Sequence, residues 1–380
     1  MEATAVHKLI DRQTGKITTL YCEGNTLIVV TDTGGKTRLV SKTFADQTAA
    51  AQQLVKKEWE LLKKGAVMKA DTTQAGDTLL HVYIGAGYTG CLSFVATPHG
   101  TFVYRPGGNG KVMGLQDELV CIDQDGNITR TLTLPGLLPW RVRYDTQSDQ
   151  LLLDLDHYIF TYDFATDAFT KLTHQLNLPA SFATIAAGTW AYASHPFYYI
   201  SQSPSSDRAE FALEANIIKG SIPMRASLSP DGKLLALHNV EGKVTLLRTA
   251  DNSVVMELQG DFGIAEQLIW TKDGKQVIVL NIRGTSRLHI FEIATGNVVT
   301  YPGLALPGYA QDVSDCCLNA SNTLLVVTQR IHAFVFDFVN KKFLYQFVLS
   351  HCVKTAEINF VDKQTLGVRT DYGCFSLYRL

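Results

Sequence analysis

Two pairs of carboxylates stand at a spacing that could support acid–base chemistry. Asp154 and Asp156 lie in "LLLDLDHY", and Asp312 and Asp315 lie in "AQDVSD". Glycoside hydrolysis needs two carboxyl groups about 5–10 Å apart across the scissile bond. Aspartate is also favoured where a strand ends in a turn, because its side chain bonds to the turn backbone. We therefore expect structural aspartates here, with a glycan-directed enzyme as the less favoured alternative.

The tract "RPGGNGKVMG", residues 105–114, is the part of the chain that most resembles a phosphate-binding loop. A P-loop requires glycine where Arg105 stands and Ser or Thr where Val112 stands, followed by a helix. We expect a hairpin loop instead, from which Arg105, Asn109 and Lys111 could contact a partner. The chain also contains no Gly-x-Ser-x-Gly elbow, so no catalytic residue is predicted.

The remaining reactive side chains do not form a ligand pattern. Ten histidines are spread singly, and seven cysteines contain no Cys-x-x-Cys pair, so we predict no metal, no cofactor and no disulfide framework. Reduced cysteines favour the cytoplasm. The net charge of −2 argues against chain-wide attraction to nucleic acid, and no stretch has the length and apolarity of a membrane span or a secretory signal.

From residue 78 onward the chain consists of short apolar or alternating runs closed by turn residues, which is typical of an all-β fold. In residues 227–260 the pattern predicts strands near Met224–Ser229, Leu234–Asn239, Val244–Arg248 and Val254–Leu258. The next segment repeats this arrangement after about 43 residues, within the range of propeller blades. Weaker copies cover 90–135, 138–174, 182–219 and 308–350.

The last unit, 352–380, supplies three strands, and "TLLHVYIGA", residues 78–86, stands alone before the first complete unit. Pairing these segments would close a ring of about seven blades and remove exposed edges. The region resembles the WD-repeat-like β-propellers: "SPDGK", 229–233, matches their first hairpin, and Tyr162-Asp163, Phe291-Glu292 and Phe336-Asp337 stand where Trp-Asp would be. We expect these acidic residues to buttress turns. The fold class predicted is mainly β: a seven-bladed β-propeller closed by an N-terminal strand.

Residues 1–70 predict a small α+β domain, followed by a linker at 71–77 and the propeller at 78–380. Strands in "KITTLYCEGNTLIVVT" and "KTRLVSKTF" precede a helix with Asp46 as N-cap, Gly65 as its stop, and an inward face of Ala51, Val55, Trp59 and Leu62. "EGNT", 23–26, "KTFA", 42–45, and "LLKKG", 61–65, are similar to the Trp-Gly-Arg (WGR) domains found in poly(ADP-ribose) polymerases and many bacterial proteins. By register, Thr31, Asp32 and Thr33 stand at the triplet, so the resemblance implies a retained frame whose recognition edge has changed.

These observations favour a noncatalytic protein–protein interaction scaffold, or adaptor subunit, of a bacterial multiprotein complex. The bacterial setting is implied by the WGR resemblance alone. Alternatives are a nucleic-acid-associated module acting through the WGR-like domain and, less favoured, a propeller enzyme acting on a glycan. The candidate partner-binding residues are basic, turn-forming or aromatic: Thr31, Asp32, Thr33, Lys36, Arg38, Arg105, Asn109, Lys111, Arg208 and Tyr309.

Overall fold

The structure is a computed structural model of the whole chain. It describes residues 6–70, 74–85, 92–107, 116–136, 139–155, 158–171, 182–194, 197–201, 209–212, 225–240, 242–260, 263–281, 288–299, 301–306 and 313–380. Most of these residues lie in strands, which confirms a mainly β fold.

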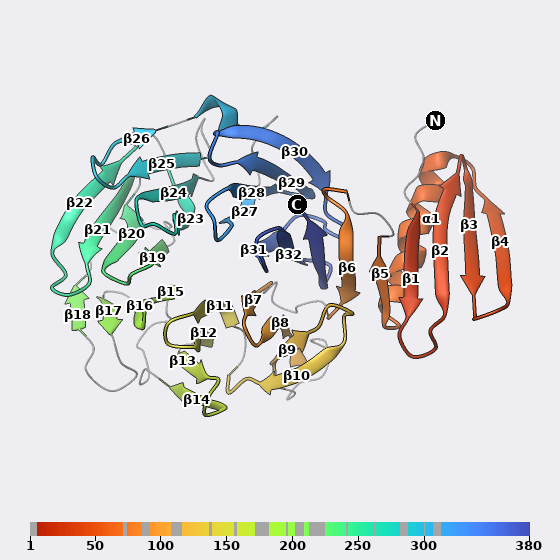
Figure 1. Cartoon of the computed structure of the whole chain (residues 1–380), viewed down its shortest axis with the longest axis horizontal. Coiled ribbons are helices and arrows are strands. Elements are labelled where there is room, and N and C mark those ends of the chain that lie inside the picture. Colours follow the sequence, from red (N-terminus) through yellow and green to blue (C-terminus); the bar gives the residue numbers. More distant parts are fainter. Residues whose placement is uncertain are drawn as a thin grey trace.

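The N-terminal unit is an antiparallel sheet with one helix packed against it. Its strands are β1 (His7–Asp11), β2 (Ile17–Glu23), β3 (Thr26–Asp32), β4 (Thr37–Thr43) and β5 (Ala66–Lys69), in the order β5-β1-β2-β3-β4, and its helix is α1 (Gln47–Leu62). The apolar core between helix and sheet includes Leu9, Leu20, Leu54 and Leu62. Figure 1 shows this unit beside the rest of the molecule.

The helix begins and ends where its sequence predicts. The Asp46 carboxylate accepts a hydrogen bond from the Ala49 amide at 2.7 Å, and Gly65 takes a left-handed φ of 93° just after the helix. The predicted inward face is confirmed at Leu62 but is wrong by one position elsewhere, because Val55 is exposed and Ala50, Leu54 and Glu58 are buried.

The rest of the chain forms a ring of sheets, the arrangement of a β-propeller (Figure 1). Six are separate four-stranded antiparallel sheets. Their strands are β7 (Phe94–Thr97), β8 (Gly100–Arg105), β9 (Glu118–Ile122) and β10 (Ile128–Thr133); β11 (Pro139–Asp145), β12 (Gln150–Leu155), β13 (Tyr158–Asp163) and β14 (Ala168–Lys171); β15 (Phe182–Ala186), β16 (Thr189–Ser194), β17 (Phe197–Ser201) and β18 (Ala209–Ala212); β19 (Arg225–Leu228), β20 (Leu234–Val240), β21 (Lys243–Arg248) and β22 (Val254–Gln259); β23 (Ala265–Trp270), β24 (Gln276–Asn281), β25 (Leu288–Glu292) and β26 (Val298–Val299); β27 (Val313–Leu318), β28 (Leu324–Gln329), β29 (His332–Asp337) and β30 (Lys342–Val348). A short 3-10 helix, η3 (Pro302–Leu304), follows β26.

The ring closes where the two ends of the propeller sequence pair, as the sequence predicts. β31 (Ala356–Phe360), β32 (Thr365–Thr370) and β33 (Cys374–Arg379) form a meander, and β6 (Thr78–Tyr83) adds antiparallel to β33 with Phe375 opposite Val82. β6 also pairs with β5, where Val67 faces Val82 and Met68 faces His81. The segment expected to be a linker therefore connects two paired strands, and one nine-stranded sheet runs from β31 to β4.

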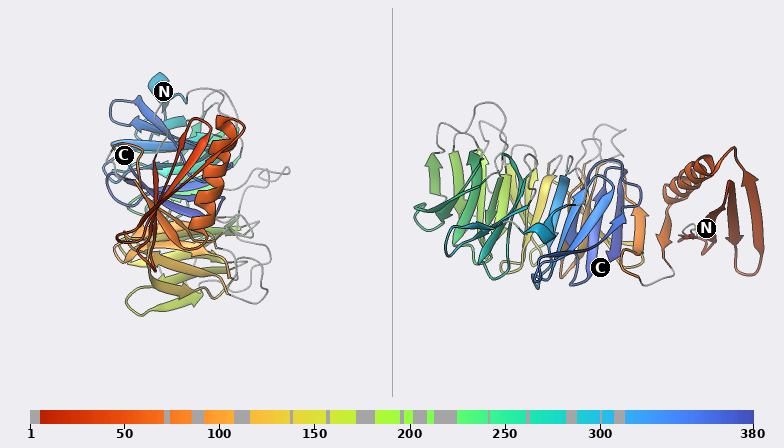
Figure 2. Two further views of the ribbon diagram at one scale, coloured as in Figure 1. Left: turned by 90° about the vertical axis from the view of Figure 1, so that its right-hand side faces the viewer. Right: turned by 90° about the horizontal axis from the view of Figure 1, so that it is seen from above.

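Burial follows strand position within each sheet. Inner strands such as β12 and β24 are buried on both faces, whereas outer strands such as β10, β22 and β30 are largely exposed. Apolar clusters join residues of neighbouring sheets, as where β24, β25, β28 and β29 pack together. Seen from the side in Figure 2, the sheets stand next to one another around the ring. Packing between sheets is thus the main apolar core.

Hydrogen bonds between a side chain and a neighbouring backbone tie adjacent sheets together near the ring centre. The Val142 amide donates to Ser93 Oγ at 2.8 Å, the Cys316 amide to Gln267 Oε1 at 2.9 Å, and the Ile358 amide to Asp315 Oδ2 at 2.8 Å. Similar contacts join Asp145 to the Ala187 and Gly188 amides, Thr184 to the Leu228 amide, Arg225 to the Glu266 carbonyl, and Glu357 to the Phe94 amide.

Candidate functional site

The β3–β4 hairpin brings five of the predicted contact residues together. Thr31 lies opposite Arg38 and Asp32 lies opposite Thr37. The turn between them is built by polar contacts, because Asp32 Oδ1 accepts from the Gly34 amide at 2.9 Å and Thr33 Oγ1 donates to the Lys36 carbonyl at 3.3 Å. Asp32 and Thr33 thus have a structural role in the turn, and Lys36 and Arg38 extend from it along β4.

β4 is the free end of the nine-stranded sheet. It is last in the strand order, and all seven of its residues are exposed on both faces, including Leu39 at 62% and Val40 at 46%. Lys36, Arg38 and Lys42 carry positive charge along it, and the strand contains no acidic residue. An edge strand offers a row of backbone donors and acceptors to an extended chain. We call residues 36–43 the binding edge.

The other predicted contacts are not part of this edge. Arg105 ends β8 and forms an ion pair with Glu118 across the β8–β9 ladder, with 2.6 Å between Arg105 Nη2 and Glu118 Oε2. Asn109, Lys111, Arg208 and Tyr309 lie outside the described residues. The structure therefore gathers five of the ten candidates and places Arg105 in a different sheet.

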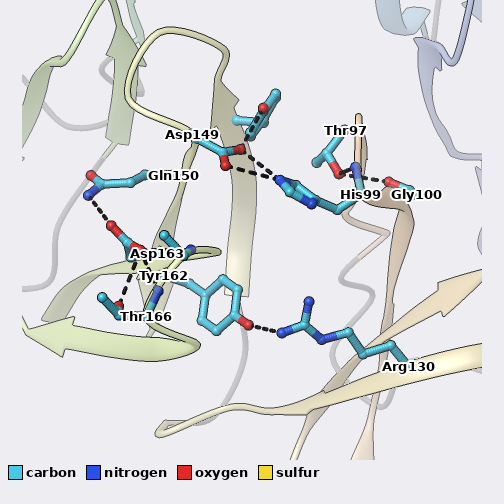
Figure 3. Close-up of polar contacts among 11 residues, drawn as sticks. Thr97, His99, Gly100, Arg130, Asp149, Gln150, Tyr162, Asp163 and Thr166 are labelled. Atoms are coloured by element: carbon cyan, nitrogen blue, oxygen red, sulfur yellow. Dashed lines mark hydrogen bonds and ion pairs between the residues drawn. The ribbon is translucent and has the colours of Figure 1, made fainter.

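A second group of polar side chains joins the sheets β7–β10 and β11–β14 at their periphery (Figure 3). His99 Nε2 lies 2.9 Å from Asp149 Oδ1, and its ring stacks on Phe164 with centroids 4.0 Å apart. Arg130 Nη2 lies 2.6 Å from Asp167 Oδ1 and also contacts the Tyr162 hydroxyl. Hydrogen bonds from His99 and Tyr144 hold the pKa of Asp149 below its usual value.

The acidic residues in place of the WD-repeat aspartate buttress turns in two of the three predicted cases. Asp163 Oδ1 accepts from the amides of Ala165 and Thr166 at 2.9 Å, and Asp337 Oδ1 accepts from the Asn340 amide at 2.9 Å. These bonds lower the pKa of both carboxyl groups. Glu292 instead pairs with the Gln276 side chain on the adjacent strand.

Buried and half-buried charged residues gather where the first strands of neighbouring sheets meet. β7, β11, β15, β19, β23, β27 and β31 contact one another in sequence around the ring. Seven of the charged residues on these strands and β12 form what we call the axial cluster: Arg141, Arg143, Asp154, Arg225, Glu266, Asp315 and Glu357. Only Asp154 and Asp315 were singled out by the sequence pattern, and their partners Asp156 and Asp312 lie outside the described residues.

Burial perturbs these carboxyl groups strongly. Desolvation raises the pKa of Asp154 to about 7, that of Asp315 to about 6 and that of Glu357 to about 7, although the charges of Arg141 and Arg143 act in the opposite direction. Desolvation, followed by repulsion from Arg141, lowers the pKa of Arg143 to about 10. Asp315 and Glu357 accept hydrogen bonds from backbone amides of the next sheet, so both have a structural role in joining neighbouring sheets. Asp154 Oδ1 is buried without a hydrogen-bond partner among the described residues.

Comparison with known proteins places the fold. No family model and no curated protein matches the sequence. Among solved structures, the β-propeller domain of Cps50 (Swd1) from Myceliophteria thermophila aligns with a TM-score of 0.60 at 10% identity, over 80% of this chain and 99% of that chain. A chain of the mitotic checkpoint complex aligns with a TM-score of 0.60 at 10% identity, over 82% and 97%. KlHsv2 with a replaced loop aligns with a TM-score of 0.55 at 11% identity, over 73% and 88%.

The fold is that of a WD40-like β-propeller. In this WD40-like propeller the Ser229-Asp231 hairpin behaves as the sequence resemblance implies: Ser229 Oγ lies 2.7 Å from Asp231 Oδ1 and accepts from the Leu234 amide. Within the described residues, no helix has the length and apolarity needed to cross a bilayer.

Proposed function

We propose that the protein is a noncatalytic protein–protein interaction scaffold, an adaptor subunit of a bacterial, cytoplasmic multiprotein complex. The observation that carries the proposal is the binding edge, a fully exposed basic strand at the end of a long continuous sheet. The fold neighbours support this role, because one of them is a component of the mitotic checkpoint complex. Six described cysteines are free, which fits a reducing compartment.

The proposal includes a finer reading of the architecture. We propose seven blades, namely the six separate sheets and a seventh blade made of β31, β32, β33 and β6. We place a WGR-like domain at residues 1–70, with its Trp-Gly-Arg triplet replaced by Thr31, Asp32 and Thr33, a linker at 71–77 and the propeller at 78–380. We also propose a second partner-binding surface, formed by Arg105, Asn109, Lys111, Arg208 and Tyr309.

The binding edge favours an acidic, extended peptide segment as the partner. Addition of a strand supplies backbone hydrogen bonds, and the side chains of Arg38 and Lys42 on one face of β4 supply charge complementarity. The negative charge of Asp32 at the β3–β4 turn repels phosphate and so weakens attraction of this edge to nucleic acid. A protein partner is therefore favoured over nucleic acid.

The test compares affinity capture from the native source by the wild-type chain and by the double variant R38E/K42E. The matched control is K233E/K275E, which makes the same charge change at ring turns where the lysines are 80% and 77% exposed. We expect one stoichiometric protein to be recovered by the wild type and the control and to be lost with the edge variant. Recovery of the same partner protein by the wild type, the control and the edge variant would contradict a role of the binding edge in partner binding.

Two further outcomes would favour the alternative functions. Salt-dependent binding of DNA ends that is lost in R38E/K42E would support a nucleic-acid module, since phosphate contacts weaken steeply as salt rises. Hydrolysis of glycoside substrates by the purified protein, abolished in Asp154→Asn, would support an enzyme, because the raised pKa of Asp154 is the property of a general acid. We expect neither activity.

A further inference from the structure

Two imidazoles and a thiol meet beside the strands that close the ring. His81 is on β6, Cys374 is on β33 and His351 lies between β30 and β31. One ligand atom from each lies within 4.8 Å of the other two. His81 and Cys374 are fully buried, and the His351 side chain is 2% exposed. Solvent is therefore excluded from a group of side chains that are strong ligands for transition metals.

The strand register explains why these residues share one face. Cys374 lies opposite Tyr83 and Ser376 lies opposite His81 in the antiparallel β6–β33 pair. Side chains two residues apart on a strand point to the same face, so Cys374 and Ser376 flank His81. Met68 lies opposite His81 on the other neighbouring strand, β5. The face thus carries an imidazole, a thiol and a thioether on adjacent strands.

A hydroxyl orients the His81 imidazole, and a more distant carboxylate faces the His351 imidazole. His81 Nδ1 lies 2.6 Å from Ser376 Oγ, and His351 Nε2 lies 3.8 Å from a carboxylate oxygen of Glu58 on α1. Their inner nitrogens, His81 Nε2 and His351 Nδ1, face each other at 2.9 Å. A proton that His81 Nδ1 donates to Ser376 leaves the lone pair of His81 Nε2 for a metal ion, as in metal sites where a hydroxyl fixes the histidine tautomer. Loss of the proton shared between the two inner nitrogens would make His351 Nδ1 the second ligand. Tetrahedral zinc needs ligand nitrogens about 3.3 Å apart, so these two nitrogens need to separate by only a few tenths of an ångström.

Aromatic side chains enclose the group. The Trp59 ring lies 5.7 Å from the His351 ring, 5.0 Å from Tyr83 and 4.9 Å from Tyr372, measured between centroids. The sequence spacing predicts that Trp59 faces the N-terminal sheet. These contacts explain why it packs against the ring closure instead. They hold α1, and with it Glu58, against the ring closure.

We propose that His81, His351 and Cys374 bind a borderline or soft transition-metal ion of the zinc type, with Ser376 as a positioning residue. Imidazole and thiolate are the ligands that zinc takes in proteins, and Met68 offers a soft fourth ligand from β5. The ion would join β6, β33 and the segment after β30, and so fix both the ring closure and the position of α1. This inference departs from the expectation of no metal site, which the spread of the histidines favoured, and it does not depend on the proposed scaffold function.

The test measures metal content in the full-length protein, purified without chelators, by elemental analysis. We expect about one ion per chain in the wild type and in Cys352→Ser, and loss of that ion in Cys374→Ser. Cys352 is the matched control, because it adjoins His351 in sequence but its thiol contacts the Arg330 and Thr355 carbonyls instead. Ser376→Ala should weaken zinc binding about 10–100-fold, the usual effect of losing the outer hydrogen-bond partner of a ligand.

Two readouts on the wild-type chain keep the proposal falsifiable if Cys374→Ser does not fold. Substitution with Co²⁺ should give a thiolate-to-cobalt charge-transfer band together with tetrahedral visible bands. In urea below the unfolding midpoint, where local opening exposes buried thiols, added Zn²⁺ should slow alkylation of Cys374 but not of Cys352, as read by mass spectrometry. A protein without bound metal, without the cobalt band and without protection would overturn the site and leave a histidine–histidine hydrogen bond in its place.

Discussion

The pKa values of single carboxyl groups in this propeller shift in opposite directions, depending on whether the group is exposed or buried. Asp163 and Asp337 lie at exposed turns, where amide donors lower their pKa, whereas Asp154 is buried beside Arg141 and Arg143. The sequence predicts aspartates at strand ends but cannot tell which are buried, because burial in the axial cluster depends on residues far apart in the chain. The charged neighbours of Asp154 and Asp315 were missed for that reason.

The axial cluster predicts a pH-dependent stability. Asp154 titrates at about 7 in the folded protein and near 3.8 when unfolded, so the folded state binds the proton more tightly. Its contribution to the unfolding free energy is full below about pH 4 and is lost as pH rises through 7. Asp154→Asn cannot titrate, so its unfolding free energy should fall less between about pH 4 and 7 than that of the wild type.

Urea unfolding at several pH values measures this difference. Asp315 and Glu357 have raised pKa values in the same range, so the variant should flatten the dependence without abolishing it. An unchanged slope would mean that Asp154 does not titrate as its burial requires.

Strands and hairpins are the elements that local sequence determines best. The unit 227–260 folds as β19 to β22 with bounds within about two residues of those expected, because turn residues such as Gly232, at a φ of 69°, mark its hairpins. The helix was located correctly but its inward face was not. Periodicity shows that a helix has an apolar stripe, but Trp59 packs on a part of the chain that no local pattern identifies.

Hydrogen bonds between sheets should make a measurable contribution to stability. Ser93→Ala leaves the buried Val142 amide without its acceptor, and we expect a loss of about 1–3 kcal/mol in unfolding free energy. Ser321→Ala is the control, because that hydroxyl is exposed and bonds only to the Thr323 hydroxyl; its effect should stay within about 0.5 kcal/mol. Denaturant midpoints measure both, and equal effects would contradict the role of Ser93.

At the scale of the whole molecule, the sequence predicted that the ring closes by pairing of its first and last strands. An incomplete last unit and an unaccompanied strand at 78–86 identified the pairing of β6 with β33. The continuation of that sheet through β5 into the N-terminal unit was not predicted, since a polar stretch at 71–77 looks like a linker whether or not the flanking strands pair.

Two truncations test the closing strand. A chain of residues 74–380 keeps β6 and should remain monomeric and folded, with a lower melting temperature because the β5 pairing is lost. A chain of residues 84–380 loses the buried Leu80 and Val82 and exposes β33 as an edge, so we expect aggregation. Size-exclusion chromatography and thermal melts followed by circular dichroism distinguish the two. Similar behaviour of both chains would contradict closure by β6.

The unbroken sheet from β31 to β4 also has a mechanical consequence. A ligand tethered to β4 would pull on a row of backbone hydrogen bonds that runs, strand by strand, to the strand holding the ring shut. Load applied at the periphery therefore reaches the closure without crossing a hinge. The N-terminal unit and the ring closure are thus coupled through one sheet, at the residue pairs that β5 makes with β6.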